Sequence, residues 1–181
     1  MKKYLLYFLV SICCVFNVQA ENLPDGFSQV LPKIKDWGND PVLVSAVKAK
    51  NAEGETLEAV KKRDAEWRKI DGFDDQMKAL MNNGAAKRLL ELEKSEKYFF
   101  ELFLMDNNGA IVAMTNKTSD YWQGDEAKWQ ETFKGGKGAV HIGEIEFDES
   151  AQDYLVQVSV PVMDGGAAIG AITIGIILDD L

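Results

Sequence analysis

Three aromatic residues and one acid lie close together in the second half of the chain. Tyr121, Trp122 and Trp129 offer large apolar faces on which a small ligand can stack, and such faces also attract cations. Asp120 beside them could pair with a cationic ligand, or could accept hydrogen bonds within a turn instead. The tryptophans could equally hold this segment onto the rest of the protein. The cluster therefore predicts either a small-molecule site or a packed loop.

Two further candidates lie on predicted strands. His141, the only histidine, could donate a hydrogen bond into a pocket, although a lone strand histidine can also be structural. Tyr154 or its neighbour Asp153 could reach the same pocket, because adjacent strand residues point to opposite faces. The candidate ligand-binding residues are Asp120, Tyr121, Trp122, Trp129, His141 and Tyr154.

The sequence gives thin support for catalysis. No serine–histidine–acid arrangement stands out, and one histidine cannot form a zinc cluster. The stretch Asp106 to Gly109 lacks the further acidic ligands and the closing glutamate of a calcium-binding EF-hand, and a hairpin turn explains it. We therefore expect no enzyme activity, no metal and no cofactor. A small hydrolase with an unrecognised site is the least favoured alternative.

The N-terminus has the pattern of a secretory signal peptide. Met1 to Lys3 is basic, Tyr4 to Val18 is mostly apolar, and Ala20 ends a small-x-small cleavage motif. An uncleaved membrane anchor is an alternative, but the apolar run is shorter than the roughly 20 residues that span a bilayer. The residues before Cys13 and Cys14 do not suit lipid attachment. We expect a signal peptide over residues 1–20 and a single domain over 21–181.

Cleavage would leave 181 − 20 = 161 residues, the size of one domain, with no cysteine. Loss of Lys2 and Lys3 would change the formal charge from −9 to −11. Such an acidic domain is poorly suited to nucleic acid, whose backbone is also negative. We expect a periplasmic protein that is not embedded in the membrane.

The chain divides into a helical first half and a strand-rich second half. Apolar spacing predicts helices over 27–37, 41–51, 56–67 and 74–94, with a possible break at Asn82-Asn83-Gly84. Thr56 and Asp125 are candidate helix caps, the latter for a short helix over 125–133. Strands are expected over 98–105, 110–115, 139–147, 153–163 and 167–178.

The expected fold class is α+β. Asp-Asn-Asn-Gly and Asp-Gly-Gly turns, at 106–109 and 164–166, suit tight hairpins. The order of elements predicts a five-stranded antiparallel sheet, with long N-terminal helices on one face. The insertion over residues 116–137 would cover a pocket on the other face.

This ordered set of segments resembles the Cache family of extracytoplasmic sensor domains, which have a PAS-like fold. Residues 40–51 look like the long first helix of that family, and Asp64 to Trp67 look like its acidic-x-x-Trp pattern. Asp106 to Gly109, Asp120 to Trp129 and Pro161 to Gly170 look like its first hairpin, pocket loop and last hairpin. The similarity covers residues 27 to 178.

The resemblance implies sensing of a small organic acid, amino acid or amine outside the cytoplasm. Membrane-bound members continue into a transmembrane helix and a signalling module, whereas here nothing follows Leu181. We therefore expect a free module that acts through a membrane receptor or sensor kinase. Residues 172–176 lack the aspartate with which some relatives hold an amino-acid ammonium group. The alternative is a periplasmic structural or interaction protein with a vestigial pocket.

Overall fold

The computed structural model describes residues 23, 24 and 26–181. The predicted signal peptide, with its cleavage site, lies outside these residues. None of the helices in the described part combines the length and the apolar character that crossing a lipid bilayer requires.

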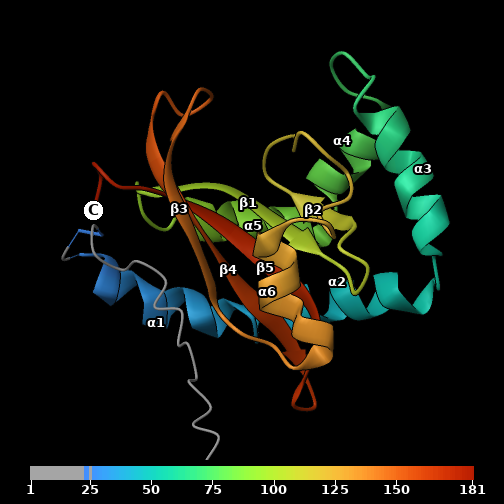
Figure 1. The fold of residues 1–181 in the computed structure, drawn as a ribbon, viewed down its shortest axis with the longest axis horizontal. Helices are drawn as coiled ribbons and strands as arrows, with labels where there is room; N and C mark the ends of the chain where they lie inside the picture. Colours follow the sequence, from blue (N-terminus) through green and yellow to red (C-terminus); the bar gives the residue numbers. More distant parts are fainter. Residues whose placement is uncertain (1–22, 25) are drawn as a thin grey trace, which may run out of the picture.

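Within the described residues, five helices precede the sheet (Figure 1). They are α1 (Phe27–Trp37), α2 (Pro41–Ala52), α3 (Leu57–Trp67), α4 (Asp75–Asn82) and α5 (Gly84–Glu93). Thr56 caps α3 as predicted, because its hydroxyl accepts a hydrogen bond from the backbone N–H of Ala59 at 3.2 Å. The predicted break in the fourth helix is confirmed. Asn83 ends α4, and its side-chain oxygen caps α5 by accepting from the backbone N–H of Ala86 at 2.8 Å.

The five strands form one antiparallel sheet in the order β2-β1-β5-β4-β3, which confirms the predicted fold class. They are β1 (Phe99–Met105), β2 (Ile111–Met114), β3 (His141–Asp148), β4 (Asp153–Asp164) and β5 (Ala167–Ile177). The helix of the insertion, α6 (Ala127–Phe133), is followed by a short 3-10 turn, η1 (Lys134–Gly136). The predicted cap of α6 is wrong: Glu126, not Asp125, precedes this helix, and no side chain caps it.

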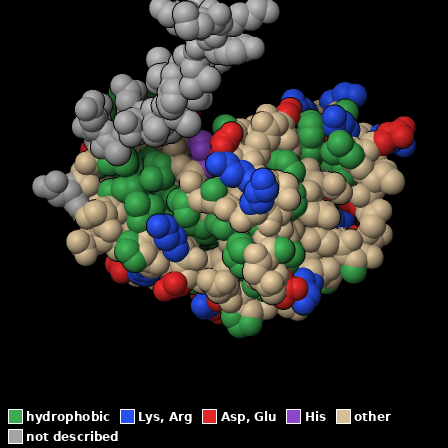
Figure 2. All heavy atoms as spheres, turned by 60° about the horizontal axis from the view of Figure 1, so that its bottom comes forward, with side chains coloured by type: hydrophobic (Ala, Val, Ile, Leu, Met, Phe, Trp, Pro, Cys, Tyr) green, Lys and Arg blue, Asp and Glu red, His purple; other side chains and the backbone are tan. Residues whose placement is uncertain are grey.

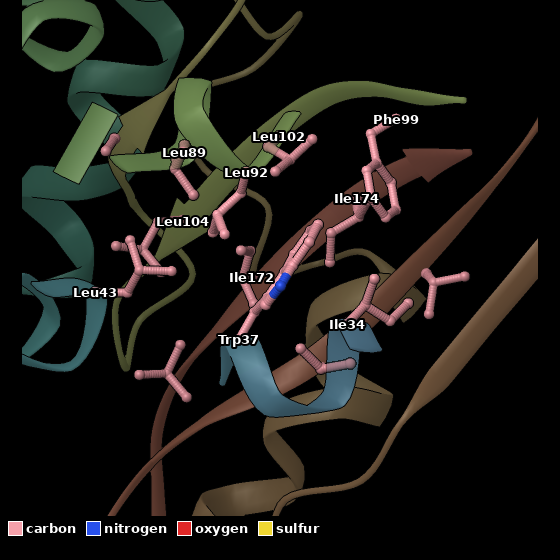
Figure 3. Close-up of a cluster of buried hydrophobic side chains, with 14 of the residues drawn as sticks. Ile34, Trp37, Leu43, Leu89, Leu92, Phe99, Leu102, Leu104, Ile172 and Ile174 are labelled. Atoms are coloured by element: carbon pink, nitrogen blue, oxygen red, sulfur yellow. The ribbon is translucent and has the colours of Figure 1, made fainter. Parts of the chain in front are cut away.

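A first hydrophobic core fills the space between one face of the sheet and helices α1, α2 and α5. Trp37 of α1 and Leu89 and Leu92 of α5 point toward Ile172 and Ile174 of β5 (Figure 3). These side chains are buried, and each fully buried apolar side chain of this size stabilises the fold by about 1.5–3 kcal/mol. The predicted arrangement of helices on this face holds for α1, α2 and α5.

A second core lies on the other face, and α3 and α4 belong to it. Val60 and Trp67 of α3 and Met77 of α4 pack with Phe103 of β1 and Tyr121 of the insertion. A turn at Gly54, whose φ of 65° suits glycine, separates α2 from α3 and lets the chain change direction. These two helices therefore lie on the same side as the insertion, whereas the N-terminal helices were expected mainly on the opposite face.

The face of the molecule in Figure 2 carries scattered charges and an apolar area. In the view of Figure 2, hydrophobic side chains gather into a continuous area, with lysine and arginine side chains beside it. Four large hydrophobic residues of the β3–β4 region are partly exposed, namely Val140, Ile145, Phe147 and Tyr154.

Candidate ligand-binding groove

The insertion is fastened to α3 through a buried carboxylate. Asp64, only 6% exposed, accepts hydrogen bonds from the backbone N–H groups of Tyr121 and Trp122 at 3.0 and 3.1 Å. Its other oxygen pairs with Arg68 at 2.9 Å. Since a buried carboxylate needs such partners, Asp64 both satisfies two backbone donors and fixes where the insertion lies.

Trp67 makes a second attachment one helical turn further along α3. Its indole N–H donates to the backbone oxygen of Thr118 at 2.9 Å, and its ring lies 5.6 Å from that of Tyr121. Both side chains are almost fully buried. The acidic-x-x-Trp pattern of the sequence therefore has a physical role, because both of its ends hold the insertion.

Trp122 and Trp129 attach the insertion to the turn between β1 and β2. The indole N–H of Trp122 donates to the backbone oxygen of Asn108 at 2.8 Å, and that of Trp129 donates to the backbone oxygen of Asp106 at 3.1 Å. Trp129 also stacks on Phe133 at 4.9 Å. Each indole donor already has a partner, so both rings act here as packing groups.

Asp120 is also engaged within the protein. Its carboxylate pairs with Arg68 at 3.2 Å, so the same guanidinium joins Asp64 and Asp120. Partial burial raises the pKa of the Asp120 carboxyl, and the Arg68 charge acts in the opposite direction. A cationic ligand at Asp120 would have to displace Arg68.

His141 and Tyr154 lie apart from the other four candidates. His141 lines a hollow of about 230 Å³ between β3 and the start of α6, where partial burial lowers the pKa of its imidazole. Tyr154 lies opposite Phe147 on the face of the sheet that α1 covers, and it is 55% exposed. The structure brings together Asp120, Tyr121, Trp122 and Trp129, and it does not bring His141 or Tyr154 to them.

The larger hollow is a groove between α2 and α4, with a volume of about 730 Å³. Buried lining residues include Ala85 of α5, Val112 of β2 and Tyr121 of the insertion. Its walls include the small side chain of Ala49 from α2 and Leu80 from α4. Among the six candidates only Tyr121 lines this groove, which makes it the one that the structure joins to a sizeable hollow.

A hydroxyl, an amide and an ammonium group line the groove. Ser45 and Gln76 face it from opposite walls, and neither side chain forms a hydrogen bond with another described residue. Lys50 is held by Glu53 and Glu55 at 2.8 Å each. Burial alone would lower the pKa of Lys50, but these two hydrogen bonds outweigh it and raise that pKa.

Tyr121 is 1% exposed, and burial raises the pKa of its phenol to about 12. No described residue makes a hydrogen bond to its hydroxyl group. The neutral hydroxyl can therefore donate to, or accept from, a ligand in the groove at physiological pH. No cluster of metal-binding side chains occurs among residues 23, 24 and 26–181.

Two side chains fix the walls of the groove relative to each other. Asp40 caps α2 by accepting from the backbone N–H of Val42 at 2.9 Å, and it also accepts from Arg88 of α5 at 2.8 Å. Asn83 donates from its side chain to the backbone oxygen of Val112 at 2.9 Å. The groove is thus bounded by elements that are tied to one another, so its shape exists without a ligand.

Sequence reasoning missed Ser45, Lys50 and Gln76. A signal was present on α2, where Ser45 and Ala49 are four residues apart and therefore lie on one helix face. Small side chains on such a face leave room beside the helix. The partner wall, α4, is distant in the sequence, and its position was not predictable from spacing.

No protein-family model matches the sequence, and a search of curated proteins found no significant match. Among solved structures, similar chains include the ligand-binding domain of the Pseudomonas aeruginosa amino-acid chemoreceptor PctC in complex with GABA. That chain has 15% sequence identity and a TM-score of 0.42, and the match covers 84% of this chain and 62% of that one. The Vibrio cholerae histidine kinase DctB sensor domain has 12% sequence identity and a TM-score of 0.46. That match covers 85% of this chain and 51% of the DctB chain.

The ligand-binding domain of the Pseudomonas fluorescens chemoreceptor CtaA in complex with L-alanine has 10% identity and a TM-score of 0.41, with 85% and 61% covered. This chain thus spans half to under two thirds of the length of these structures. These three solved structures are sensor or ligand-binding domains of two chemoreceptors and a histidine kinase.

Proposed function

We propose that this chain is a Cache-type sensor module that binds a small organic acid, amino acid or amine in the groove between α2 and α4. The observation that carries the proposal is the groove itself. It combines a volume of about 730 Å³ and apolar surfaces with three polar side chains, Ser45, Gln76 and Tyr121, that lack hydrogen-bond partners among the described residues. Apolar walls with a few convergent polar groups are typical of small-molecule sites.

Within this proposal Tyr121 contacts the ligand and the rest of the insertion keeps Tyr121 in place. Asp64 holds the backbone of Tyr121, and Trp67 packs against its ring. Asp120, Trp122 and Trp129 are then supporting residues, because their polar groups are already paired within the protein. His141 and Tyr154 stand outside the proposed site.

The charged side chains of the groove limit the class of ligand that it can bind. Lys50 is its one lysine, and two glutamates balance that ammonium group. A ligand carboxylate would have to compete with Glu53 and Glu55, whereas a hydroxyl, an amide or an amine would meet no such competition. We therefore favour an amine or a zwitterion over a purely anionic acid.

The cellular role follows from the sequence pattern. Residues 1–20 act as a cleaved signal peptide in this proposal, and residues 21–181 work in the periplasm without enzymatic activity. A membrane receptor or a sensor kinase then reads the bound state. Intact-mass measurement on a periplasmic extract tests the processing: a chain that starts at Glu21 is expected, and retention of Cys13 or a lipid-sized mass increment would contradict it.

A thermal-shift screen of organic acids, amino acids and amines tests ligand binding. A ligand that binds only the folded state raises the melting temperature, and the stabilisation grows with the logarithm of the ligand concentration once that concentration exceeds Kd. We expect at least one amine or zwitterion to do so. A flat response across all three classes would favour the interaction-protein alternative.

A further inference from the structure

β3 is an edge strand with one side free of described neighbours. The strand order places β4 on its inner side, and no described residue forms a backbone hydrogen bond with its outer side. The unpaired N–H and C=O groups of such an edge can pair with an extended segment from another protein.

One face of this edge is apolar. Ile145 lies opposite Val156, a residue of the first core, and Phe147 lies opposite Tyr154, so all four side chains are on the face that α1 covers further inward. Phe147 is 52% exposed and meets the Tyr154 ring at 5.4 Å. Adjacent exposed aromatic residues at a sheet edge favour contact with a partner.

The other face of the edge is acidic. Glu144, Glu146 and Asp148 alternate with the apolar residues along β3. Neither Glu144 nor Glu146 forms an ion pair with a described residue, and the nearby Lys128 is already paired with Glu126 at 2.8 Å. The strand therefore offers two exposed negative charges that lack a cation.

The charges decide between a second copy and a different partner. Pairing of two β3 strands would bring glutamates from both copies together, and like charges opposite each other destabilise a sheet. Acids that served only to keep the edge free would not need exposed Phe147 and Tyr154 on the opposite face. A partner strand with alternating apolar and basic residues would cover the apolar face of β3 and neutralise its acidic face.

We propose that β3 binds, as an added strand, an extended segment of a partner protein in which apolar and basic residues alternate. The apolar side chains of that segment cover Ile145 and Phe147, and its lysines or arginines pair with Glu144 and Glu146. A β-bulge between Ile142 and Ile145 marks where regular alternation begins on β3. None of the acids and apolar residues in this argument lines the groove between α2 and α4, so the inference stands whether or not a ligand binds there.

Synthetic peptides test this proposal on the purified protein. The probe has the length of β3, 8 residues, and alternates lysine with valine. One control peptide alternates glutamate with valine, and another has the probe's composition with its lysines and valines in two blocks. Calorimetric titration should detect binding of the alternating lysine peptide and of neither control. Equal binding of the blocked peptide, or no binding of any peptide, would overturn the proposal.

Two variants locate the contact. Glu146→Lys should weaken binding of the lysine peptide by about fivefold, because it replaces an attractive cross-strand pair by a repulsive one. Glu66→Lys on α3 changes an exposed residue and alters the net charge equally, so it should bind like the wild type. If both variants weaken binding to the same extent, only net charge matters and the proposal fails. A concentration-dependent dimer in sedimentation that Phe147→Ser abolishes would assign the edge to a second copy instead.

Discussion

The insertion over 116–137 and the groove between α2 and α4 both contain polar groups beside aromatic or apolar surface, but they use them differently. Around the insertion, Asp64 and Trp67 of α3 hydrogen-bond to its backbone. Trp122 and Trp129 of the insertion donate to the backbone of the turn between β1 and β2. In the groove, the side-chain polar groups of Ser45, Gln76 and Tyr121 have no hydrogen-bond partner among the described residues.

This difference separates a structural loop from a binding surface. A buried donor with a partner adds to stability, and a ligand gains nothing from it unless the partner leaves. A donor at the wall of an open groove can exchange water for a ligand instead. Tyr121 belongs to both regions, because its ring packs on Trp67 and the residue also lines the groove.

The largest expected loss of stability comes from removing an attachment of the insertion. Trp67→Ala removes a fully buried ring together with its hydrogen bond, and it should lower the free energy of unfolding by about 3–5 kcal/mol. Urea denaturation measures the change. Leu57→Ala on the same helix, at a residue that is 43% exposed, should change stability by less than about 1 kcal/mol. Similar losses in both variants would contradict the assigned role of Trp67.

A smaller loss is expected at the carboxylate. Asp64→Ala leaves two backbone donors without an acceptor and should cost about 2–3 kcal/mol. Asp64→Asn keeps one acceptor oxygen, so it should lower the free energy of unfolding by less than Asp64→Ala does. Hydrogen exchange should become faster at the amides of Tyr121 and Trp122 in the alanine variant. Asp75→Ala, at a fully exposed side chain, is the matched control, and unchanged exchange in Asp64→Ala would refute the attachment.

Alkaline titration tests whether the phenol of Tyr121 is buried. Its pKa is raised from 10.0 to about 12 in the folded protein, so the unfolded chain loses this proton first. Stability from this group is complete below pH 10 and is lost as pH rises toward 12. The absorbance of ionised tyrosine, compared between wild type and Tyr121→Phe, should show a difference that appears near pH 12. A difference centred near pH 10 would mean that the phenol is not buried as described.

The smallest expected effect lies on the groove walls. Gln76→Ala and Ser45→Ala remove side chains that bond to no described residue, so each should change the free energy of unfolding by less than about 0.5 kcal/mol. A loss of more than about 1 kcal/mol in urea denaturation would show that these groups are structural, and the comparison between the two regions would then fail.

The strands and hairpins could be predicted from the sequence because their signals are local. Gly109 and Gly165 adopt positive φ in the two hairpins that their turn motifs predicted, and the strands follow from the apolar pattern around them. Helix starts were also predictable where a side chain caps the first turn, as at Thr56. The predicted start of α6 was wrong, because no side chain caps this helix and Asp125 lies one residue before the N-cap position, Glu126.

The site was less predictable because it depends on packing between distant segments. Ser45 and Gln76 line one groove although they lie on different helices, and Asn83 ties the break between α4 and α5 to β2. The position of Tyr154 depends on which face of β4 α1 covers, and period-two alternation does not determine that. The aromatic cluster was correctly grouped around Tyr121, but its indole donors turn out to face backbone carbonyls.

The central claim is that a ligand occupies the groove between α2 and α4. The most direct test is calorimetric titration of the strongest ligand from the thermal-shift screen into Ala49→Trp, whose added indole fills the groove from the exposed side of α2. Ala65→Trp, an exposed change on α3 away from the groove, is the matched control. We predict that Ala49→Trp weakens binding by about tenfold or more while Ala65→Trp binds like the wild type. Wild-type affinity in Ala49→Trp would contradict the account and place the ligand elsewhere.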